Sequence, residues 1–367
     1  MTKKTRNIFL LIFFAIILLL PVLDNIFSFS PVKNLFEKRQ PNHLPESPRS
    51  ISSLPEYFKN FEAFFNDHYG FRKSLILANG KIMDNVFNES PSARALIGKD
   101  GWLFFDNQNS ILDAQGLLKS DEKKIATLAR HLIKNWRDLR AKNINYVLVI
   151  AADKSSIYPE FLPDFVKFSN SEHRADALLK VLKAIDKNFP VIDLRPILLS
   201  EKENQAIYHK TDTHWNRRGA YFGYVEIMKE FGLAHRAPQE FVPVEAEKKD
   251  GDIAAIMGLE IVETNYELRP KFARSFEQLD ATDAELKLFH KPIFYKNYDR
   301  NLPVLFAYKD SFFDNLMEFF ADSFSGAYFV NEFPCDLDLK IIKKYHANFV
   351  VQEFWEARID EVAGVCE

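Results

Sequence analysis

The stretch LPVLFAYKDSFFDNLMEFF, residues 302–320, decides the fold. Its first part, 302–308, is a continuous apolar run with the β-branched and aromatic character of a buried strand, and 312–320 then changes to helical spacing. Ser311 therefore lies at a turn from a strand into a helix. Ligands collect outside the carboxyl ends of strands in open α/β sheets, so this hydroxyl is a candidate nucleophile. Helix capping by Asp310 or Ser311 is the simpler alternative.

A second polar segment, TDTHW at residues 211–215, supplies a carboxylate and an imidazole just before a predicted helix. Asp212 is close enough in sequence to His214 to accept the Nδ1 proton and leave Nε2 free as a base. Capping of the helix by Thr213 is the alternative. A cap does not require Asp, His and Trp side by side, so the two segments together predict a catalytic site that contains Ser311.

Six short motifs follow one another along roughly residues 50–360: DHYGFR at 67–72, GKDGWLF at 98–104, KSSIYPEFLP at 154–163, DTHW at 212–215, GDI at 251–253 and DSF at 310–312. In this order they resemble the SGNH-hydrolase-like proteins of polysaccharide O-acetylation, the alginate O-acetyltransferase family of AlgJ and AlgX with its DHHW-type relatives. Each motif is weak alone, but the set is specific.

The resemblance implies a flavodoxin-like α/β fold of three layers around a parallel sheet. It also implies a triad with Ser311 as nucleophile, His214 as base and Asp212 as the carboxylate that orients the imidazole. A membrane-bound O-acyltransferase would supply an acetyl group. Ser311 would carry this group as an ester and pass it to a hydroxyl of a cell-surface or secreted polysaccharide. No cofactor or metal is implied. A carbohydrate O-acetylesterase and a non-catalytic subunit of a polysaccharide export complex are the alternatives.

One position departs from the family pattern. The serine block of SGNH enzymes normally reads Gly-Asp-Ser, and Lys309 stands here in place of the glycine. Glycine adopts positive φ at no steric cost, whereas lysine does not. The turn before Ser311 must therefore tolerate a side chain, or the site is altered. The backbone N–H of Ser311 is the one oxyanion donor that the sequence identifies.

Four further residues are candidates for the substrate site. Lys154 and Tyr158 follow a predicted strand and belong to the cleft in the resembled family, where a lysine could bind an anionic sugar. A surface lysine and a packed tyrosine are the alternative. Trp215 could stack on a sugar ring, although tryptophan beside a helix start more often packs in the core. Asp310 is the second carboxylate that could orient His214.

The N-terminus predicts a membrane anchor. An apolar run at residues 7–23 follows three basic residues, and its length is near the lower limit of about 17 for spanning a bilayer. A cleavable signal peptide is the alternative, but its apolar region has about 7 to 15 residues and ends in a small-x-small site. We expect residues 1–30 to be an uncleaved signal anchor in the cytoplasmic membrane, with the catalytic domain in the periplasm or outside the cell.

The rest of the chain divides into a linker and one domain that contains an insertion. Residues 31–50 are rich in proline, serine and charge and predict a linker, and 51–367 predict one large domain. Within it, 234–301 fits no βα unit and is expected to form a lobe or loops over the site. The net charge of −3 gives no reason to expect nucleic-acid binding. Cys335 and Cys366, the only cysteines, permit one disulfide in an exported protein but are too few for a structural zinc site.

Strands and helices alternate along this domain, as a parallel sheet requires. Strands are predicted at 146–151, 191–194, 304–308, 327–330 and 349–354. Helices are predicted within 53–86 and at 120–143, 171–187, from 216 onward and at 312–321.

Overall fold

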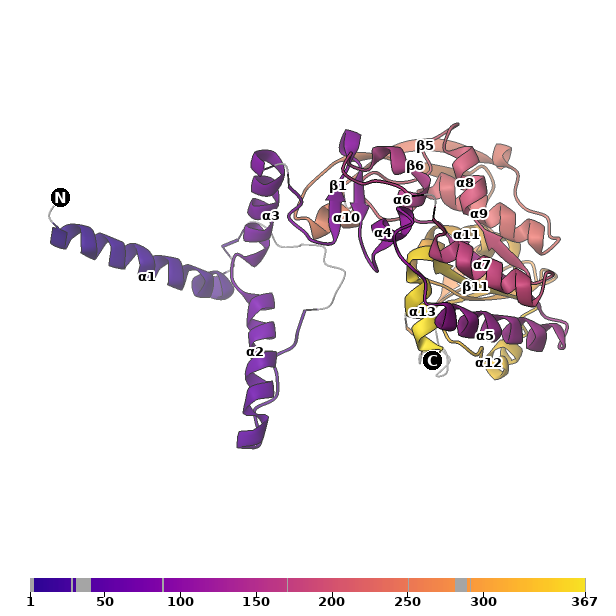
Figure 1. Cartoon of the computed structure of the whole chain (residues 1–367), viewed down its shortest axis with the longest axis horizontal. Coiled ribbons are helices and arrows are strands. Elements are labelled where there is room, and N and C mark those ends of the chain that lie inside the picture. Colours follow the sequence, from indigo (N-terminus) through magenta and orange to yellow (C-terminus); the bar gives the residue numbers. More distant parts are fainter. Residues whose placement is uncertain are drawn as a thin grey trace. The chain divides into compact units, whose positions relative to one another are not determined.

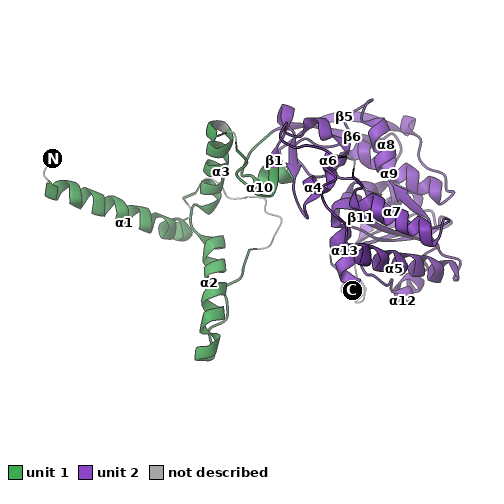
Figure 2. Ribbon diagram, viewed as in Figure 1, with its two compact units in different colours: residues 1–95, 250–261 green, residues 96–249, 262–367 purple. Residues whose placement is uncertain are grey.

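The computed structural model describes residues 3–27, 29–30, 41–87, 89–169, 171–249, 251–280, 289–290 and 292–366. The chain forms two compact units (Figure 2), one of residues 1–95 with 250–261 and one of 96–249 with 262–367. The predicted linker at 31–50 is described only from residue 41. Residues 250, 281–288 and 291 of the predicted insertion also lie outside the described residues.

The first unit is helical. It contains α1 (Lys3–Phe27), α2 (Leu54–His68), α3 (Arg72–Ile82) and the short α10 (Asp252–Ile256). Helix α1 is apolar and 25 residues long, so at 1.5 Å per residue it exceeds the hydrocarbon core of a bilayer, which is about 30 Å thick. It is therefore long and apolar enough to cross a membrane once, as the predicted anchor requires.

The DHYGFR motif packs against the end of α1. Asp24, the one acid of α1, is buried and accepts hydrogen bonds from the N–H groups of Ser30 (2.6 Å) and Phe71 (2.7 Å). Gly70 lies so close that a Cβ there would be 2.0 Å from the carbonyl oxygen of Pro21. The motif thus fixes the turn between α2 and α3 against the helix end.

The second unit is built on a seven-stranded sheet with the order β4-β3-β11-β9-β10-β8-β7. The parallel strands are β3 (Asn145–Ala151), β4 (Val191–Asp193), β9 (Val304–Tyr308), β10 (Gly326–Val330) and β11 (Phe349–Trp355). At one edge, β8 (Ile293–Asn297) and β7 (Phe276–Leu279) run antiparallel. The predicted, mostly parallel α/β sheet is confirmed.

Helices cover both faces of this sheet (Figure 1). One face packs against α5 (Glu122–Arg140), α7 (Arg174–Ile185), α12 (Leu339–Lys344) and α13 (Ile359–Val365), and the other against α8 (Arg195–Glu201), α9 (Arg217–Glu230) and α11 (Met317–Ser323). The strands are apolar on both sides: in β3, Leu148 joins one core and Val149 the other. Burial on both faces explains why these strands are continuous apolar runs in the sequence.

The strand register places the carboxyl ends of three strands along one edge of the sheet. Gln352 of β11 pairs with Tyr308, the last residue of β9, and Trp355 pairs with Ala151, the last residue of β3. The carboxyl ends of β3, β9 and β11 therefore lie along one edge, and the turn with Ser311 begins there.

The region at 234–301 is only partly the separate lobe that the sequence predicted. An antiparallel pair, β5 (Phe241–Lys248) and β6 (Glu263–Pro270), stands apart from the main sheet, but β7 and β8 extend that sheet. Helices α8, α10, α12 and α13 were not predicted, nor were the shorter elements β1 (Ala95–Ile97), β2 (Leu103–Phe105), α4 (Ser110–Ala114) and α6 (Lys154–Ile157). Segments of three to five residues are too short to show a period of their own.

Cys335 and Cys366 form a disulfide with a sequence separation of 31 residues. It joins the segment after β10 to the end of α13, and so holds the last helix on the sheet.

Replacing both cysteines by alanine should lower the free energy of unfolding by about 2 to 4 kcal/mol, because the unfolded chain regains the freedom that a closed loop of this length removes. Denaturant unfolding of the detergent-solubilised protein measures this. Reductant added to the unaltered protein should reproduce the shift, and equal midpoints for the two proteins would contradict the prediction.

Candidate functional site

Ser311 is the first residue of a 3-10 helix, η7 (Ser311–Leu316), which begins three residues after β9. Asp310 caps this helix: one carboxylate oxygen accepts the Phe312 N–H and the other the Trp355 N–H, both at 2.8 Å. Of the two capping alternatives, Asp310 is thus the cap. The side chain of Ser311 is exposed, and its hydroxyl bonds elsewhere.

Lys309 fits the turn in place of glycine. Within the described part of the chain, positive φ outside glycine occurs only at Phe71, Asp100, Gln108, Asn109, Asn143 and His346. The Lys309 N–H donates to the carbonyl of Val330 at 3.0 Å, which continues the contact between β9 and β10, and its ammonium pairs with Asp314. The approach to Ser311 is therefore extended backbone that tolerates a side chain.

The histidine segment forms a compact loop closed by a β-bridge between Tyr208 and Trp215. Within the loop, the His209 N–H donates to the carbonyl of His214 at 3.3 Å. The following helix, α9, is capped by Asn216, which accepts the N–H groups of the second and third helical residues at 2.9 and 3.2 Å. The alternative that Thr213 caps this helix is therefore wrong.

The structure brings Ser311, His214 and Asp212 together. His214 Nε2 lies 2.8 Å from Ser311 Oγ, and His214 Nδ1 lies 2.7 Å from Asp212 Oδ1. The same carboxylate oxygen accepts the backbone N–H of His214 at 3.0 Å. An Nδ1–H donated to Asp212 leaves Nε2 as the acceptor for the serine proton, which is the arrangement that nucleophilic catalysis needs.

Trp215 ties the two turns together. Its Nε1–H donates to the carbonyl of Phe312 at 2.9 Å, and Asn315 Nδ2 donates to the carbonyl of Trp215 at 2.9 Å. The indole is only 1% exposed. The indole therefore offers no face to a sugar, and the stacking that was one expectation from the sequence is wrong. Trp215 instead fixes His214 beside the serine turn.

Electrostatics favour an ionised Asp212. Burial alone would raise its pKa, but the hydrogen bonds and the positive charge available from His214 hold the pKa of Asp212 well below its usual range. Lys248 adds to this, because its ammonium lies 3.5 Å from the second carboxylate oxygen. His209 behaves differently: burial lowers the pKa of His209 to about 4, so this ring is neutral near pH 7.

Asp310 is not placed to orient the imidazole. Its carboxylate is used by two backbone N–H groups, and its own N–H donates to Glu353 at 3.0 Å. Burial raises the pKa of both Asp310 and Glu353. These two acids lie beneath the serine turn and hold its backbone; of the carboxylates suggested by the sequence, Asp212 is the one that contacts His214.

Lys154 lies beneath the histidine loop, not in the cleft. Only 3% of it is exposed, and its ammonium donates to the carbonyls of His209 (3.2 Å), Lys210 (3.1 Å) and Asp212 (2.8 Å). It also lies 5.8 Å from the centre of the Trp102 ring, within the range of a cation–π contact. Lys154 therefore supports the loop and does not make the contact with an anionic sugar that was one expectation from the sequence.

Tyr158 supports the same loop from behind. It is 5% exposed, its hydroxyl accepts the N–H of Ile207 at 3.3 Å, and burial raises the pKa of Tyr158 to about 12. It is packed rather than presented to a substrate.

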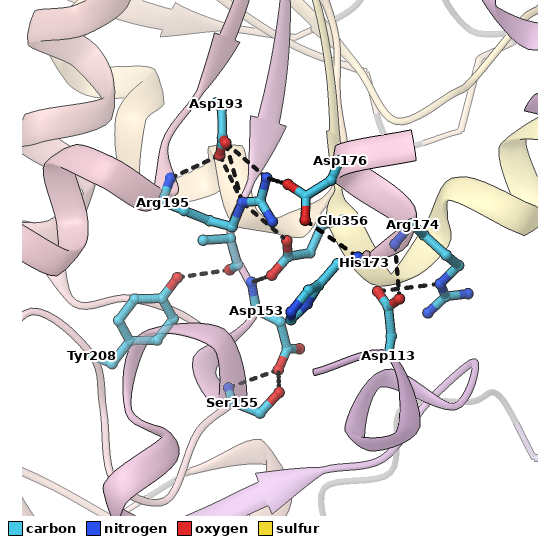
Figure 3. Close-up of polar contacts among 11 residues, drawn as sticks. Asp113, Asp153, Ser155, His173, Arg174, Asp176, Asp193, Arg195, Tyr208 and Glu356 are labelled. Carbon is cyan, nitrogen blue, oxygen red and sulfur yellow. Dashed lines mark hydrogen bonds and ion pairs between the residues drawn. The ribbon is translucent and has the colours of Figure 1, made fainter. Parts of the chain in front are cut away.

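A buried polar network holds the segment that carries Lys154 (Figure 3). Asp153 caps α6 by accepting the Ser155 N–H at 2.7 Å, and its own N–H donates to Glu356 at 2.6 Å. The Tyr208 hydroxyl, at the start of the histidine loop, donates to the carbonyl of Ala152 at 2.7 Å. The ends of β3 and β11 are thereby joined to the loop.

Arg195 completes this network (Figure 3). Its guanidinium reaches Asp176 at 2.6 Å and Asp193 at 2.8 Å, and it lies 3.7 Å from Glu356. Burial raises the pKa of Glu356 to about 8 in spite of the positive charge of Arg195. The arginine therefore joins α7, α8 and the end of β11 behind the site.

A cleft of about 480 Å³ opens beside His214 and Ser311. Its walls are formed by the histidine loop, the start of α9, η7 and the β5–β6 pair. This volume is within the range of about 300–1,000 Å³ that is usual for small-ligand pockets. The site therefore combines a hydroxyl that contacts an imidazole with space for a ligand.

Two residues of this site were missed by sequence reasoning. Lys248 contacts Asp212, and Glu263 accepts the N–H groups of Lys210 (2.5 Å) and Thr211 (3.2 Å). Both belong to the β5–β6 pair. The alternating polar and apolar residues of these strands could have predicted the pair itself. No local signal places it against the histidine loop, because that contact is long-range.

Comparison with known proteins is consistent with this architecture. The probable alginate O-acetylase AlgJ of Pseudomonas aeruginosa is 27% identical over 167 residues, which are 44% of this chain and 38% of that protein. The AlgJ of Pseudomonas syringae pv. tomato is 24% identical over 280 residues, 74% of this chain and 64% of that protein. The match thus spans less than two thirds of either relative.

The solved structure of Bacillus cereus PatB1 has a TM-score of 0.55 at 17% identity, covering 72% of this chain and 96% of that one, which shows a shared fold. The sequence model for the SGNH hydrolase-like domain of acetyltransferase AlgX matches residues 95–292, more than half of the chain. The chain therefore belongs to the AlgX family of SGNH hydrolase-like domains.

Proposed function

We propose that this protein is a serine-dependent O-acetyltransferase that acts on a cell-surface or secreted polysaccharide. The observation that carries the proposal is the unbroken chain of hydrogen bonds from Asp212 through His214 to Ser311, at 2.7 and 2.8 Å, beside a cleft. The membership of the AlgX family supports acetyl transfer as the reaction.

In the first half of the reaction, Ser311 Oγ attacks the carbonyl carbon of an acetyl donor while His214 Nε2 takes the hydroxyl proton. The imidazolium is stabilised by Asp212, and the Ser311 N–H at the start of η7 donates to the developing oxyanion. The bond to the donor oxygen or sulfur then breaks, His214 protonates that leaving group, and Ser311 carries the acetyl group as an ester.

In the second half, a sugar hydroxyl in the cleft attacks the ester carbon and gives its proton to His214 Nε2. The bond to Ser311 Oγ breaks, His214 returns the proton to the serine, and the acetylated polysaccharide leaves. Water in place of the sugar would give the esterase that the sequence leaves open. The two reactions differ only in the acceptor that reaches the acetyl-serine.

We assign the acetyl supply to a membrane-bound O-acyltransferase and the location to the outer side of the cytoplasmic membrane. Helix α1 supports membrane attachment, because it is long and apolar enough to span a bilayer. A covalent anchor of this kind raises the effective concentration of Ser311 near a donor in the same membrane.

Replacing Ser311 by alanine should abolish both labelling by a sulfonyl or phosphonyl serine probe and acetylation, because the hydroxyl that lies 2.8 Å from His214 Nε2 is removed. The fold should survive, since Asp310 and not Ser311 caps η7. Mass spectrometry of the labelled protein measures the outcome. Ser171→Ala, an exposed serine outside the cleft, should label normally; full activity of the Ser311 variant would refute the assignment of the nucleophile.

Activity should rise with pH through the ionisation of His214, because only the neutral imidazole accepts the serine proton. The low pKa of Asp212 and the pKa of about 4 for His209 mean that neither group adds a step near neutrality. Asp212→Asn should lower turnover by on the order of 10⁴, because the imidazole loses its orienting carboxylate.

A pH–rate profile with a soluble acetyl ester measures both effects. Asp336→Asn is the matched control, since Asp336 contacts the ring of His131 (3.1 Å) outside the cleft. A near-normal rate for Asp212→Asn would show that another carboxylate orients the imidazole.

Replacing Lys154 by methionine should reduce turnover by about 10- to 100-fold, because three loop carbonyls lose their hydrogen bond to the ammonium and His214 shifts from Ser311. The loss should appear with a small acetyl ester as well as with a polysaccharide. A loss confined to an anionic acceptor, as a rise in KM, would instead support sugar binding by Lys154. Lys202→Met is the control, since Lys202 donates to Ile157 and not to the loop.

A further inference from the structure

The charges in the cleft are matched in pairs. Three cationic side chains line it, and each lies close to a carboxylate: Arg217 is 2.8 Å from Glu318, Arg269 is 3.5 Å from Glu267, and Lys248 is 3.5 Å from Asp212. A positively charged subsite would need cations that are not already neutralised in this way.

The fourth acid of the cleft is paired as well. Asp314 also lines the cleft and pairs with Lys309, whose side chain is 4% exposed and so lies below the surface. Glu318 receives a second cation, Arg274, at 2.5 Å. Of the described residues that line the cleft, three are cationic and four are anionic, and each of the three cations lies against one of these carboxylates.

This balance disfavours an acidic polysaccharide. A polyuronate carries one carboxylate on every sugar, and in this cleft each carboxylate would meet carboxylates such as Glu267 and Glu318 at short range. Its charge would also lose water without gaining an unpaired cation. A neutral sugar has neither cost. Its hydroxyls can donate to the carboxylates and to the side-chain carbonyl of Asn265 or Asn315, and accept from the two arginines.

We propose that the sugar acetylated in this cleft is uncharged, a neutral hexose or N-acetylhexosamine unit and not a uronate. The inference rests on the proposed function, since it names the acceptor for the acetyl-serine at Ser311. It differs from the substrate in the names of the AlgJ relatives, because alginate is a polyuronate.

The test uses the full-length protein in detergent, with a soluble acetyl ester as donor and two matched pairs of acceptors. Each pair has one linkage and one ring configuration and differs only at C6: β-1,4-glucan against β-1,4-glucuronan hexamers, and β-1,4-mannan against β-1,4-mannuronan hexamers. We expect transfer to at least one neutral hexamer to be about 10-fold or more faster than to its uronate partner, and to be insensitive to salt because no charge pair forms.

Charge variants make the test specific to the cleft. Glu267→Gln releases Arg269, and Glu318→Gln releases Arg217 and Arg274. Each should lower KM for the uronate hexamers by about 3- to 5-fold, the size of an exposed ion pair. The control is Glu226→Gln, since Glu226 pairs with Lys229 (2.8 Å) and does not line the cleft. It should leave both acceptors unchanged.

The outcomes separate the two proposals. Equal or faster transfer to a uronate hexamer, or transfer to neither neutral hexamer while the acetyl ester is still hydrolysed through Ser311, would overturn the neutral acceptor and leave the serine chemistry in place. Absence of any acetyl-serine at Ser311 would overturn the proposed function itself.

Discussion

Three carbonyl groups of the histidine loop, those of residues 209, 210 and 212, converge on the buried ammonium of Lys154, and the placement of the imidazole depends on this contact. A buried carbonyl without a donor costs about 1–3 kcal/mol, and a buried ammonium without acceptors costs more. Each therefore stabilises the other. A lysine ammonium has three protons, which is the number that three carbonyls require. The ammonium thus adds to the β-bridge between Tyr208 and Trp215 in holding the loop in its turn.

The support continues into the sheet. Lys154 is the first residue of α6, which Asp153 caps, and the N–H of Asp153 is held by Glu356 at the end of β11. On the serine side, the N–H of Asp310 is held by Glu353 of β11. Two acids from the end of β11 thus hold the backbone that follows β3 and the backbone that follows β9. The distance between His214 and Ser311 is set by the sheet register as much as by the loops.

The sequence predicted the parts of this arrangement that depend on local pattern. The change from an apolar run to helical spacing located β9 and the serine turn, because burial on both faces leaves a continuous apolar run. The spacing of Asp212 and His214 likewise predicted their contact. The role of Lys154 could not be predicted, because a lysine after a strand has the same local pattern whether it reaches solvent or turns beneath a loop. Trp215 is similar, since its burial depends on a turn almost a hundred residues away.

In the proposed reaction, the catalytic groups and part of the acceptor site lie on different elements of the second unit. The triad stands on the carboxyl edge of the sheet, where register and buried acids fix it, whereas Glu267 and Arg269 belong to β6 of the β5–β6 pair outside that sheet. Side chains of the pair can therefore change without disturbing the hydrogen bonds among Ser311, His214 and Asp212. Glu263 and Lys248 are the exceptions, since Glu263 accepts two N–H groups of the histidine loop and Lys248, on β5, contacts Asp212. A substitution of Lys248 would alter both the charge of the cleft and the carboxylate that orients the imidazole, so Lys248 is the position at which the choice of polymer is physically coupled to the chemistry.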